Sequence, residues 1–271
     1  MRMSVIIPVK NEERNLERLL PALLEQSHPP EEILVAIAPS TTDRSREVTE
    51  KYHPDAVWVE GGMPGPGRNK GARHAHGELL LFLDADVLPG DAYLLRDIRQ
   101  DMRERSLDVA TVDHVGIDTS IREKAYFAIF NAAQRVMSHS KRPFGCGTII
   151  AAKRDVHERI GGFDERWAFY EDSDYIQRAV HDGYRFAVLD RPAYVRVDPR
   201  RLRKDGIMPV LKNGIRADRY ARKHGVITDI GLIDKDYFDH DTAMSGTERK
   251  VKPRFPTRLY TTNEKIETIQ R

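Results

Sequence analysis

Leu79-Leu80-Leu81-Phe82-Leu83-Asp84-Ala85-Asp86 is the stretch that decides the fold. Five consecutive apolar residues in front of two acids are typical of a fully buried strand that ends at a polar sheet edge. Outward from it, strand-like and helix-like runs alternate along the chain at 4–9, 16–24, 33–37, 43–51 and 56–59. This alternation predicts right-handed βαβ units, and hence an α/β fold with a mostly parallel central sheet and helices on both faces.

The rest of the chain is more mixed. The Gly/Pro-rich stretch 61–67 is expected to be an irregular loop, followed by a short helix. Strands are expected over 108–112 and 146–151, on either side of a long helix over 120–137. Further helical patterns occupy 154–160 and 173–182.

Composition and charge exclude several function classes. The chain has 271 residues and a formal net charge of +2, which argues against a strongly basic nucleic-acid binder. Its one cysteine, Cys146, excludes an internal disulfide and a multi-cysteine zinc site, and we expect it in a buried strand. No apolar run approaches the ~20 residues of a membrane span. The start passes directly into a strand-like run, so we expect no signal peptide and a cytoplasmic location.

Two pairs of acids are candidate chemical groups. If the segment is extended, Asp84 and Asp86 point to the same side and could share Mg²⁺ or Mn²⁺; the alternative is a solvated strand end. Glu171-Asp172 lies between aromatic residues and a helical pattern, so a carboxylate there could accept a proton from a bound hydroxyl. The alternative for this second pair is simple helix capping.

Basic residues suggest anion binding at two places. Arg68-Asn69-Lys70 opens a helix, where backbone amides and an arginine could hold a phosphate; the alternative is a solvated helix start. The stretch between residues 196 and 224 contains ten Lys and Arg residues but only three Asp residues. That stretch is either a solvated face or a contact for a phosphate, a diphosphate or an acidic bilayer surface.

Taken in order, these motifs resemble the family 2 glycosyltransferases, which are inverting, nucleotide-sugar-dependent enzymes of the GT-A fold. The similarity spans residues 3 to about 189, and its motifs are 5–12, 67–71, 81–86, 161–165 and 171–172. It implies a Rossmann-like GT-A domain and a divalent metal, Mn²⁺ or Mg²⁺. It also implies transfer of a sugar from a nucleotide-diphosphate donor to a hydroxyl or phosphate of a glycan or lipid-linked acceptor.

The resemblance also implies a role for each motif residue. Asp172 would be the general base, with Glu171 and Gly147 positioning the acceptor. Asp86, and with it Asp198, would hold the metal that bridges the donor diphosphate. The residues expected to bind the nucleotide sugar are Pro8, Val9, Asn11, Glu12, Ala38, Arg68, Lys70, Asp84 and Ala85.

Two departures from the family pattern affect these expectations. The second strand of family members usually ends in acids that read the base, but here Ala38-Pro39 stands in their place and only Asp43 remains. A guanine or thymidine donor, or base contacts through the backbone alone, therefore becomes more plausible than uracil recognition. Many members also supply a histidine as a metal ligand where residues 194–197 stand here, and Asp198 is the nearest candidate.

We expect three parts of the chain. Residues 1–200 form the catalytic domain, with a nucleotide-binding half over 1–110 and an acceptor-binding half over 111–200. A basic helical extension follows over 201–245, and its 200–223 stretch could touch the inner face of a membrane. The tail over 246–271 could be an arm exchanged in a homo-oligomer.

Two other functions compete with glycosyl transfer. A degenerate, non-catalytic sugar-nucleotide-binding or scaffold protein would keep the fold, and the loss of acids at Ala38-Pro39 is its one support. A sugar nucleotidyltransferase would require a glycine-rich phosphate loop directly after the first strand. The run Pro8-Val9-Lys10-Asn11-Glu12 stands there instead.

Overall fold

The computed structural model describes residues 1–52, 57–60, 64–190 and 192–233, with no side chains described for 57–60. They lie within one compact unit, Met1–Phe238. The predicted tail 246–271, and the extension beyond 233, lie outside the described residues. The domain limits at 110, 200 and 245 stay predictions.

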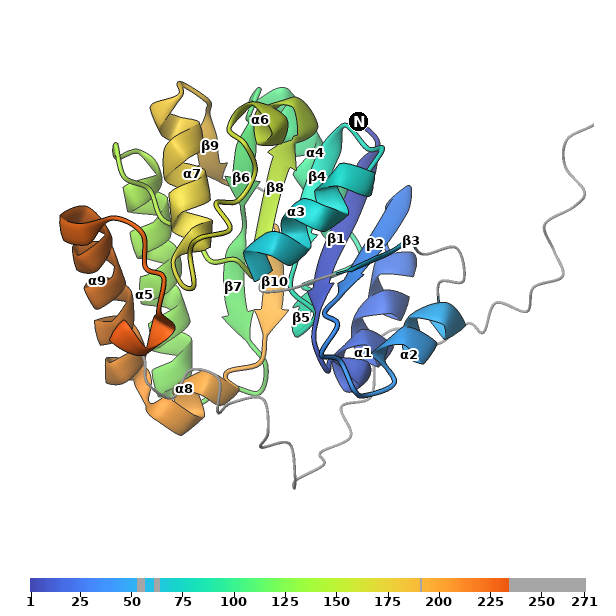
Figure 1. The fold of residues 1–271 in the computed structure, drawn as a ribbon, viewed down its shortest axis with the longest axis horizontal. Helices are drawn as coiled ribbons and strands as arrows, with labels where there is room; N and C mark the ends of the chain where they lie inside the picture. The colour runs from blue at the N-terminus through green and yellow to red at the C-terminus, as the bar shows by residue number, and fades with distance from the viewer. Residues whose placement is uncertain (53–56, 61–63, 191, 234–271) are drawn as a thin grey trace, which may run out of the picture. The chain divides into compact units, whose positions relative to one another are not determined.

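A seven-stranded sheet forms the centre of the fold (Figure 1). Its order is β3-β2-β1-β4-β8-β6-β9, and only β8 runs antiparallel to its neighbours. The strands are β1 (Met3–Val9), β2 (Glu32–Ile37), β3 (Val57–Glu60), β4 (Leu79–Leu83), β6 (Val109–Thr111), β8 (Ile149–Lys153) and β9 (Phe186–Val188). The expected mostly parallel α/β sheet is confirmed.

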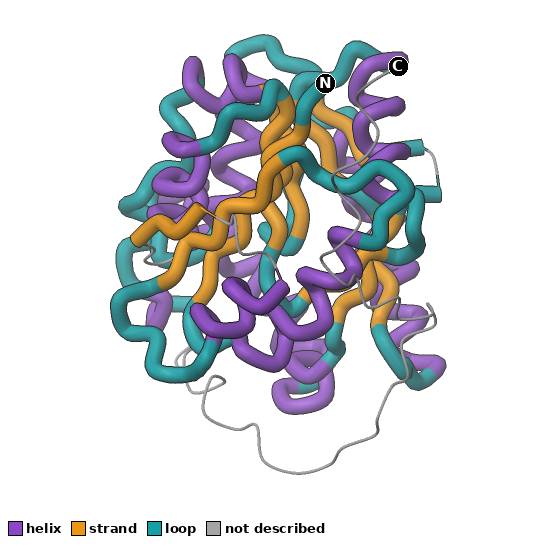
Figure 2. The backbone as a smooth tube through the Cα atoms, turned by 90° about the vertical axis from the view of Figure 1, so that its right-hand side faces the viewer, coloured by secondary structure: helices purple, strands orange, loops and turns teal. Residues whose placement is uncertain are grey.

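Helices cover both faces of this sheet because its central strands are apolar on both sides. In β1, Val5 and Ile7 join a core with α1 (Glu13–Leu24), α2 (Ser45–Tyr52) and α4 (Leu94–Glu104). Ile6 points the other way, into a core with α3 (Pro64–His74), α6 (Arg154–Arg159) and α7 (Glu171–His181). Figure 2 shows the twisted strands with helices to either side.

A smaller sheet continues from the acidic end of β4. It has the order β5-β10-β7, formed by β5 (Val87–Pro89), β10 (Tyr194–Val197) and β7 (Asp113–Gly116). The helix α5 (Ile121–Ser138) packs against β7, and the other elements of this part are α8 (Arg200–Asp205), α9 (Ile207–His224) and a short 3₁₀ turn, η1 (Ile230–Leu232). The long helix α5 begins where the sequence predicts, because Ser120 and Glu123 form a reciprocal capping box.

Two local predictions are wrong. The Gly/Pro stretch is not irregular throughout, because α3 begins at Pro64, whose missing N–H has no partner to lose in a first helical turn. Residues 61–63 lie outside the described part. Cys146 is not in a strand: β8 begins at Ile149, and the cysteine is only partly buried in the segment before it.

Candidate active site

Arg68 is the centre of the site. Its side chain is 1% exposed, and its guanidinium donates to Asp84 Oδ1 at 2.7 Å, to Glu171 Oε1 at 3.0 Å and to the carbonyl oxygen of Gly147 at 3.0 Å. Arg68 lies on α3, and its three partners come from the end of β4, the start of α7 and the segment before β8. Residues far apart in the sequence, all expected to bind donor or acceptor, are therefore joined by one planar, forked cation.

Asp172 is held beside that cluster by backbone amides. Its Oδ2 accepts from the N–H of Gly147 at 2.7 Å and its Oδ1 from the N–H of Ser173 at 2.6 Å. The peptide of Gly147 thus contacts both Asp172 and Arg68. A Cβ at Gly147 would lie 2.7 Å from Arg68 Nη2, so the position accepts only glycine without a shift of the arginine.

Burial raises the pKa of Asp172 to about 7, and the neighbouring Glu171 carboxylate adds to the rise. The amides and Arg68 act in the opposite direction but do not cancel it. A carboxylate with a pKa near neutrality, fixed in place and partly open to solvent, is suited to accept a proton from a hydroxyl. This is the chemistry of a general base.

The two acids after β4 were predicted to point to the same side of an extended segment, but the segment is not extended. Asp84 to Asp86 is a turn, closed by a bond from the N–H of Val87 to the carbonyl oxygen of Asp84 at 3.4 Å. The carboxylates therefore take different partners: Asp84 binds Arg68, while Asp86 Oδ2 lies 3.2 Å from Arg200 Nη2. Burial is the main reason that the pKa of both carboxyls rises, that of Asp84 to about 6.

Asp198 lies opposite Asp86, just beyond the paired ends of β10 and β5. Because Val197 pairs with Val87 in the antiparallel β10–β5 ladder, the residues just beyond them face each other. The Asp198 carboxylate adds to the raised pKa of Asp86. Its Oδ1 also accepts from the N–H of Arg200 at 2.9 Å.

The residues after β1 lie at the same edge of the sheet. Burial raises the pKa of Glu12 to about 7, and Asp84 and Asp86 contribute to that rise. Asn11 has a left-handed φ of 56° and accepts from the N–H of Thr42 at 2.8 Å, which closes the loop after β2. Both residues thus lie in the segment that follows β1, and their role in nucleotide binding stays a prediction.

Of the remaining predicted donor-binding positions, all but Lys70 are apolar. Val9 and Ala38 are buried, and the N–H of Ala38 donates to the carbonyl oxygen of Val9 at 2.7 Å. Pro8 is half-buried near the end of β1, and Ala85 is buried in the turn of the two acids. Lys70 is half-buried on α3, two residues beyond Arg68.

Asp43 does not replace the acids absent at Ala38-Pro39. Its Oδ2 accepts from the N–H of Glu13 at 2.9 Å and its Oδ1 from the N–H of Ser45 at 3.0 Å. Both carboxylate oxygens are thus occupied at the starts of α1 and α2. The surviving acid of the motif is a capping residue here.

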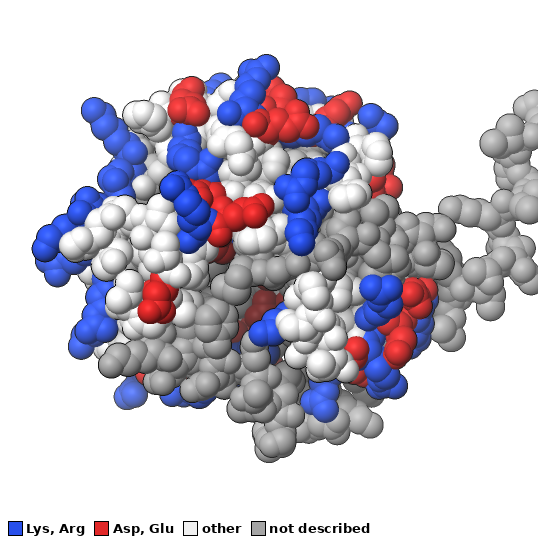
Figure 3. Space-filling view, viewed as in Figure 1, with Lys and Arg blue, Asp and Glu red and all other residues white. Residues whose placement is uncertain are grey.

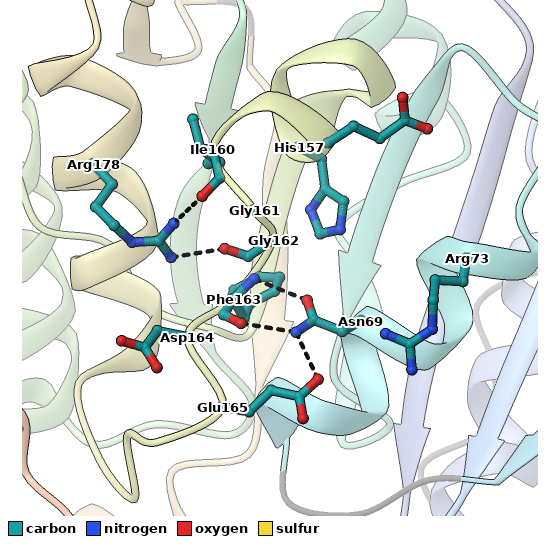
Figure 4. Close-up of a pocket in the computed structure, with 11 residues that line it drawn as sticks. Asn69, Arg73, His157, Ile160, Gly161, Gly162, Phe163, Asp164, Glu165 and Arg178 are labelled. Carbon is teal, nitrogen blue, oxygen red and sulfur yellow. Dashed lines mark hydrogen bonds between the residues drawn. The ribbon is translucent and has the colours of Figure 1, made fainter.

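A cavity of about 620 Å³ opens beside α3 on the face covered by α6 and α7 (Figure 4). Asn69, the neighbour of Arg68, binds both the N–H and the carbonyl oxygen of Phe163, at 2.8 and 2.7 Å, and Glu165 Oε1 at 3.0 Å. The Gly161-Gly162-Phe163 turn is thereby fixed to the helix that carries Arg68. From the sequence alone, Asn69 is predicted only to be part of a basic helix start, with no role of its own.

Arg200 and Thr148 are site residues that sequence reasoning did not single out. Arg200 pairs with Asp86 from 114 positions away, and the carbonyl oxygen of Thr148 accepts from the N–H of Asp84 at 3.0 Å. Arg200 belongs to the basic stretch that the sequence marked, but no local pattern separates it from its neighbours. Only the pairing of β5 with β10 brings it to the acids.

The model for the glycosyl transferase family 2 matches residues 4–161, more than half of the chain. This protein belongs to that family. The Haloferax volcanii glycosyltransferase AglE is 26% identical over 67% of this chain and 62% of its own. The Staphylococcus aureus poly(ribitol-phosphate) beta-N-acetylglucosaminyltransferase TarS is 30% identical over 72% of this chain. The present chain therefore spans less than two thirds of the length of either relative, and only 35% of the length of TarS.

Solved structures share the fold. The Pyrobaculum calidifontis mannosyltransferase PcManGT, in complex with GDP-Man and Mn²⁺, has a TM-score of 0.64 at 22% identity over 86% of this chain and 67% of its own. TarS has a TM-score of 0.59 at 22% identity over 81% of this chain and 40% of its own. The GT-A fold expected from the resemblance is confirmed.

Proposed function

We propose that this family 2 protein is a metal-dependent, inverting glycosyltransferase that uses a nucleotide-diphosphate sugar, with Asp172 as its general base. The observation that carries the proposal is the anchoring of Asp172, whose pKa burial raises to about 7, next to the Arg68 cluster. Arg68 joins Glu171, beside the proposed base, to Asp84, which is expected to bind the nucleotide sugar. The proposed base and the donor site are thereby linked through one side chain.

The residues present suit a hard divalent cation. Asp86 and Asp198 offer only oxygen donors, which Mg²⁺ and Mn²⁺ prefer. Within the described residues, no group of three or more His, Cys, Asp or Glu side chains could hold an ion without help. An ion held there would therefore need further oxygen ligands, which a donor diphosphate and water could supply. When bound, it would stabilise the charge of the departing diphosphate.

The proposed reaction is a single displacement. An acceptor hydroxyl, positioned by Glu171 and the Gly147 peptide, donates its proton to the Asp172 carboxylate as its oxygen bonds to the anomeric carbon. The bond from that carbon to the donor phosphate breaks on the opposite face, so the configuration inverts. Arg68 holds Asp84 and Glu171 in place and moves no proton.

Donor and acceptor are proposed at the level of chemical class. Solved relatives are described with UDP-GlcNAc and with GDP-Man, so either base is compatible with the fold. Because Ala38 replaces the base-reading acid and Asp43 is engaged in capping, we propose that backbone groups after β2 contact the base. The proposed acceptor is a hydroxyl or phosphate of a glycan or lipid-linked carrier.

A nucleotide panel combined with one substitution tests this function. UDP, GDP, TDP and CMP are each added to the protein with Mn²⁺ or with EDTA, and thermal unfolding is followed. We expect a metal-dependent rise of several degrees with one nucleotide, because a ligand at 100 times its Kd stabilises by about 2.7 kcal/mol. Sugar transfer from the corresponding donor is then measured for the parent and for Asp172→Asn.

Asp172→Asn is expected to lower turnover by about a hundredfold or more while nucleotide binding is kept. Asp174→Asn is the matched control, since Asp174 lies on the same helix and binds Arg178 at 2.8 Å instead. Equal turnover in Asp172→Asn and the parent would exclude Asp172 as the base. Absence of any nucleotide shift at saturation would favour the non-catalytic scaffold.

A further inference from the structure

Helix α5 presents an apolar stripe to solvent along its whole length. Ile121, Ile129 and Val136 are 80%, 66% and 72% exposed. Ala125, Ala128 and Ala132 lie exposed between them at helical spacing, so the stripe occupies one face. A different face of α5 packs inward, where Phe127 and Gln134 are buried. Large apolar side chains at such exposure, repeated on one helix face, indicate a contact surface.

Helix α9 has a second exposed apolar stripe in its first half. Met208 is 60% exposed, Leu211 37% and Ile215 59%, at the spacing of one helix face. The opposite face carries Ala217, which is buried in a small cluster with Trp167. The outward stripe is therefore not needed for the packing of α9 on the domain.

Ion pairs fix each of the two helices to a neighbouring segment. Arg203 of α8 donates to Glu123 at the start of α5 at 2.8 Å and to the carbonyl oxygen of Asp118 at 2.7 Å. Beyond the other end of α5, Arg142 lies 3.6 Å from Asp218 of α9. In Figure 1, α5 and α9 both lie at the edge of the domain that is farthest from α2.

The charged side chains of α5 and α9 are mostly basic. α5 and α9 contain one acid each: Glu123 is bound to Arg203, and Asp218 lies 2.6 Å from Arg222 and 3.0 Å from the hydroxyl of Tyr170. Figure 3 shows Lys and Arg side chains gathered along the edge where α9 lies. The exposed basic residues of the two helices are Arg122, Lys124, Lys212, Arg216, Arg219, Arg222 and Lys223.

We propose that α5 and α9 together form a docking surface for an anionic lipid bilayer. Their apolar stripes would enter the boundary between headgroups and acyl chains, while the flanking Lys and Arg side chains reach lipid phosphates. A second copy of the chain fits less well, because an isologous contact would bring like charges together. Among the described residues, no helix is long and apolar enough to span a bilayer.

This surface goes beyond the membrane contact that the sequence indicates. The sequence marks only the basic stretch 200–223, whereas α5 supplies the longer apolar face. The surface adjoins the proposed active site, since α8 connects α9 to Arg200 and Asp86. Docking rests on surface residues alone, so its failure would leave the role of Asp172 untouched.

Flotation of the full chain with vesicles tests the proposal. Phosphatidylcholine vesicles are compared with vesicles that also contain phosphatidylglycerol, at low and high salt. We expect binding only to the anionic vesicles, weakened by salt. Ile129→Glu/Val136→Glu and Arg122→Glu/Lys124→Glu are each expected to reduce bound protein by about tenfold or more. Because the substituted residues are exposed, thermal unfolding is expected to match that of the parent.

The matched control is Arg14→Glu/Arg18→Glu, which reverses two exposed charges on α1 and is expected to keep binding. Absence of parent binding, or equal loss in the control, would overturn the proposal. A parent dimer that Ile129→Glu/Val136→Glu converts to monomer, with no flotation of either, would assign the surface to a second copy and would also overturn it.

Discussion

At the residue scale, burial controls the protonation state of Asp172. Its raised pKa of about 7 means that this proposed general base is largely protonated in mildly acidic solution. With saturating donor and metal, kcat/KM for the acceptor is expected to fall about tenfold per pH unit below pH 7 and to level off above it. Initial rates between pH 5 and 9 measure this profile.

The variant Asp172→Asn supplies the control, because its residual rate should lose this pH dependence. A parent profile that stays flat down to pH 5 would contradict the assignment. Sequence alone could indicate a carboxylate at a helix start. It could not indicate the pKa, which depends on burial and on the amides of Gly147 and Ser173.

At the scale of elements, the position of Arg68 depends on how closely α3 packs on β1. A Cβ at Gly71 would lie 2.4 Å from Cγ2 of the fully buried Ile6. Gly71→Ala is therefore expected to lower the free energy of unfolding by about 1–2 kcal/mol, despite the better helix propensity of alanine. Gly214→Ala in α9 meets no atom within 4 Å and is expected to stabilise by about 0.5–1 kcal/mol. Urea unfolding of both variants measures the contrast, and equal effects would refute it.

Elements with a clear periodicity were predictable from the sequence, and the turn after β4 was not. The run Leu79–Leu83 gives β4 without error, because a fully buried strand has no polar positions to blur its limits. The turn at Asp84–Asp86 was not predicted, because two acids separated by one residue are compatible with both a strand and a turn. The Arg200–Asp86 ion pair was not predicted, because it depends on the register of β5 with β10.

At the scale of the whole molecule, stability should respond to pH through buried histidines. Burial lowers the pKa of His114 and His157 to about 4, from about 6.5 in an unfolded chain. Since the unfolded chain takes up the protons first, these groups leave stability intact above pH 6.5 and reduce it as pH falls towards 4. Glu12, Asp84 and Asp172 act in the opposite sense: their raised pKa values make the folded state bind protons first as pH falls below about 7.

These opposing contributions are separated by removing one histidine. His157 is 6% exposed and lies 3.1 Å from the hydroxyl of Tyr175. His157→Gln is expected to be less stable than the parent at pH 8, and that difference should shrink by about 2 kcal/mol by pH 4.5, because only the parent then loses the histidine contribution. Urea unfolding at four pH values between 8 and 4.5 measures it. Phe163→Leu disturbs the same aromatic cluster without a titrating group, so its difference from the parent should stay constant. A constant difference for His157→Gln as well would show that the imidazole does not limit stability in acid.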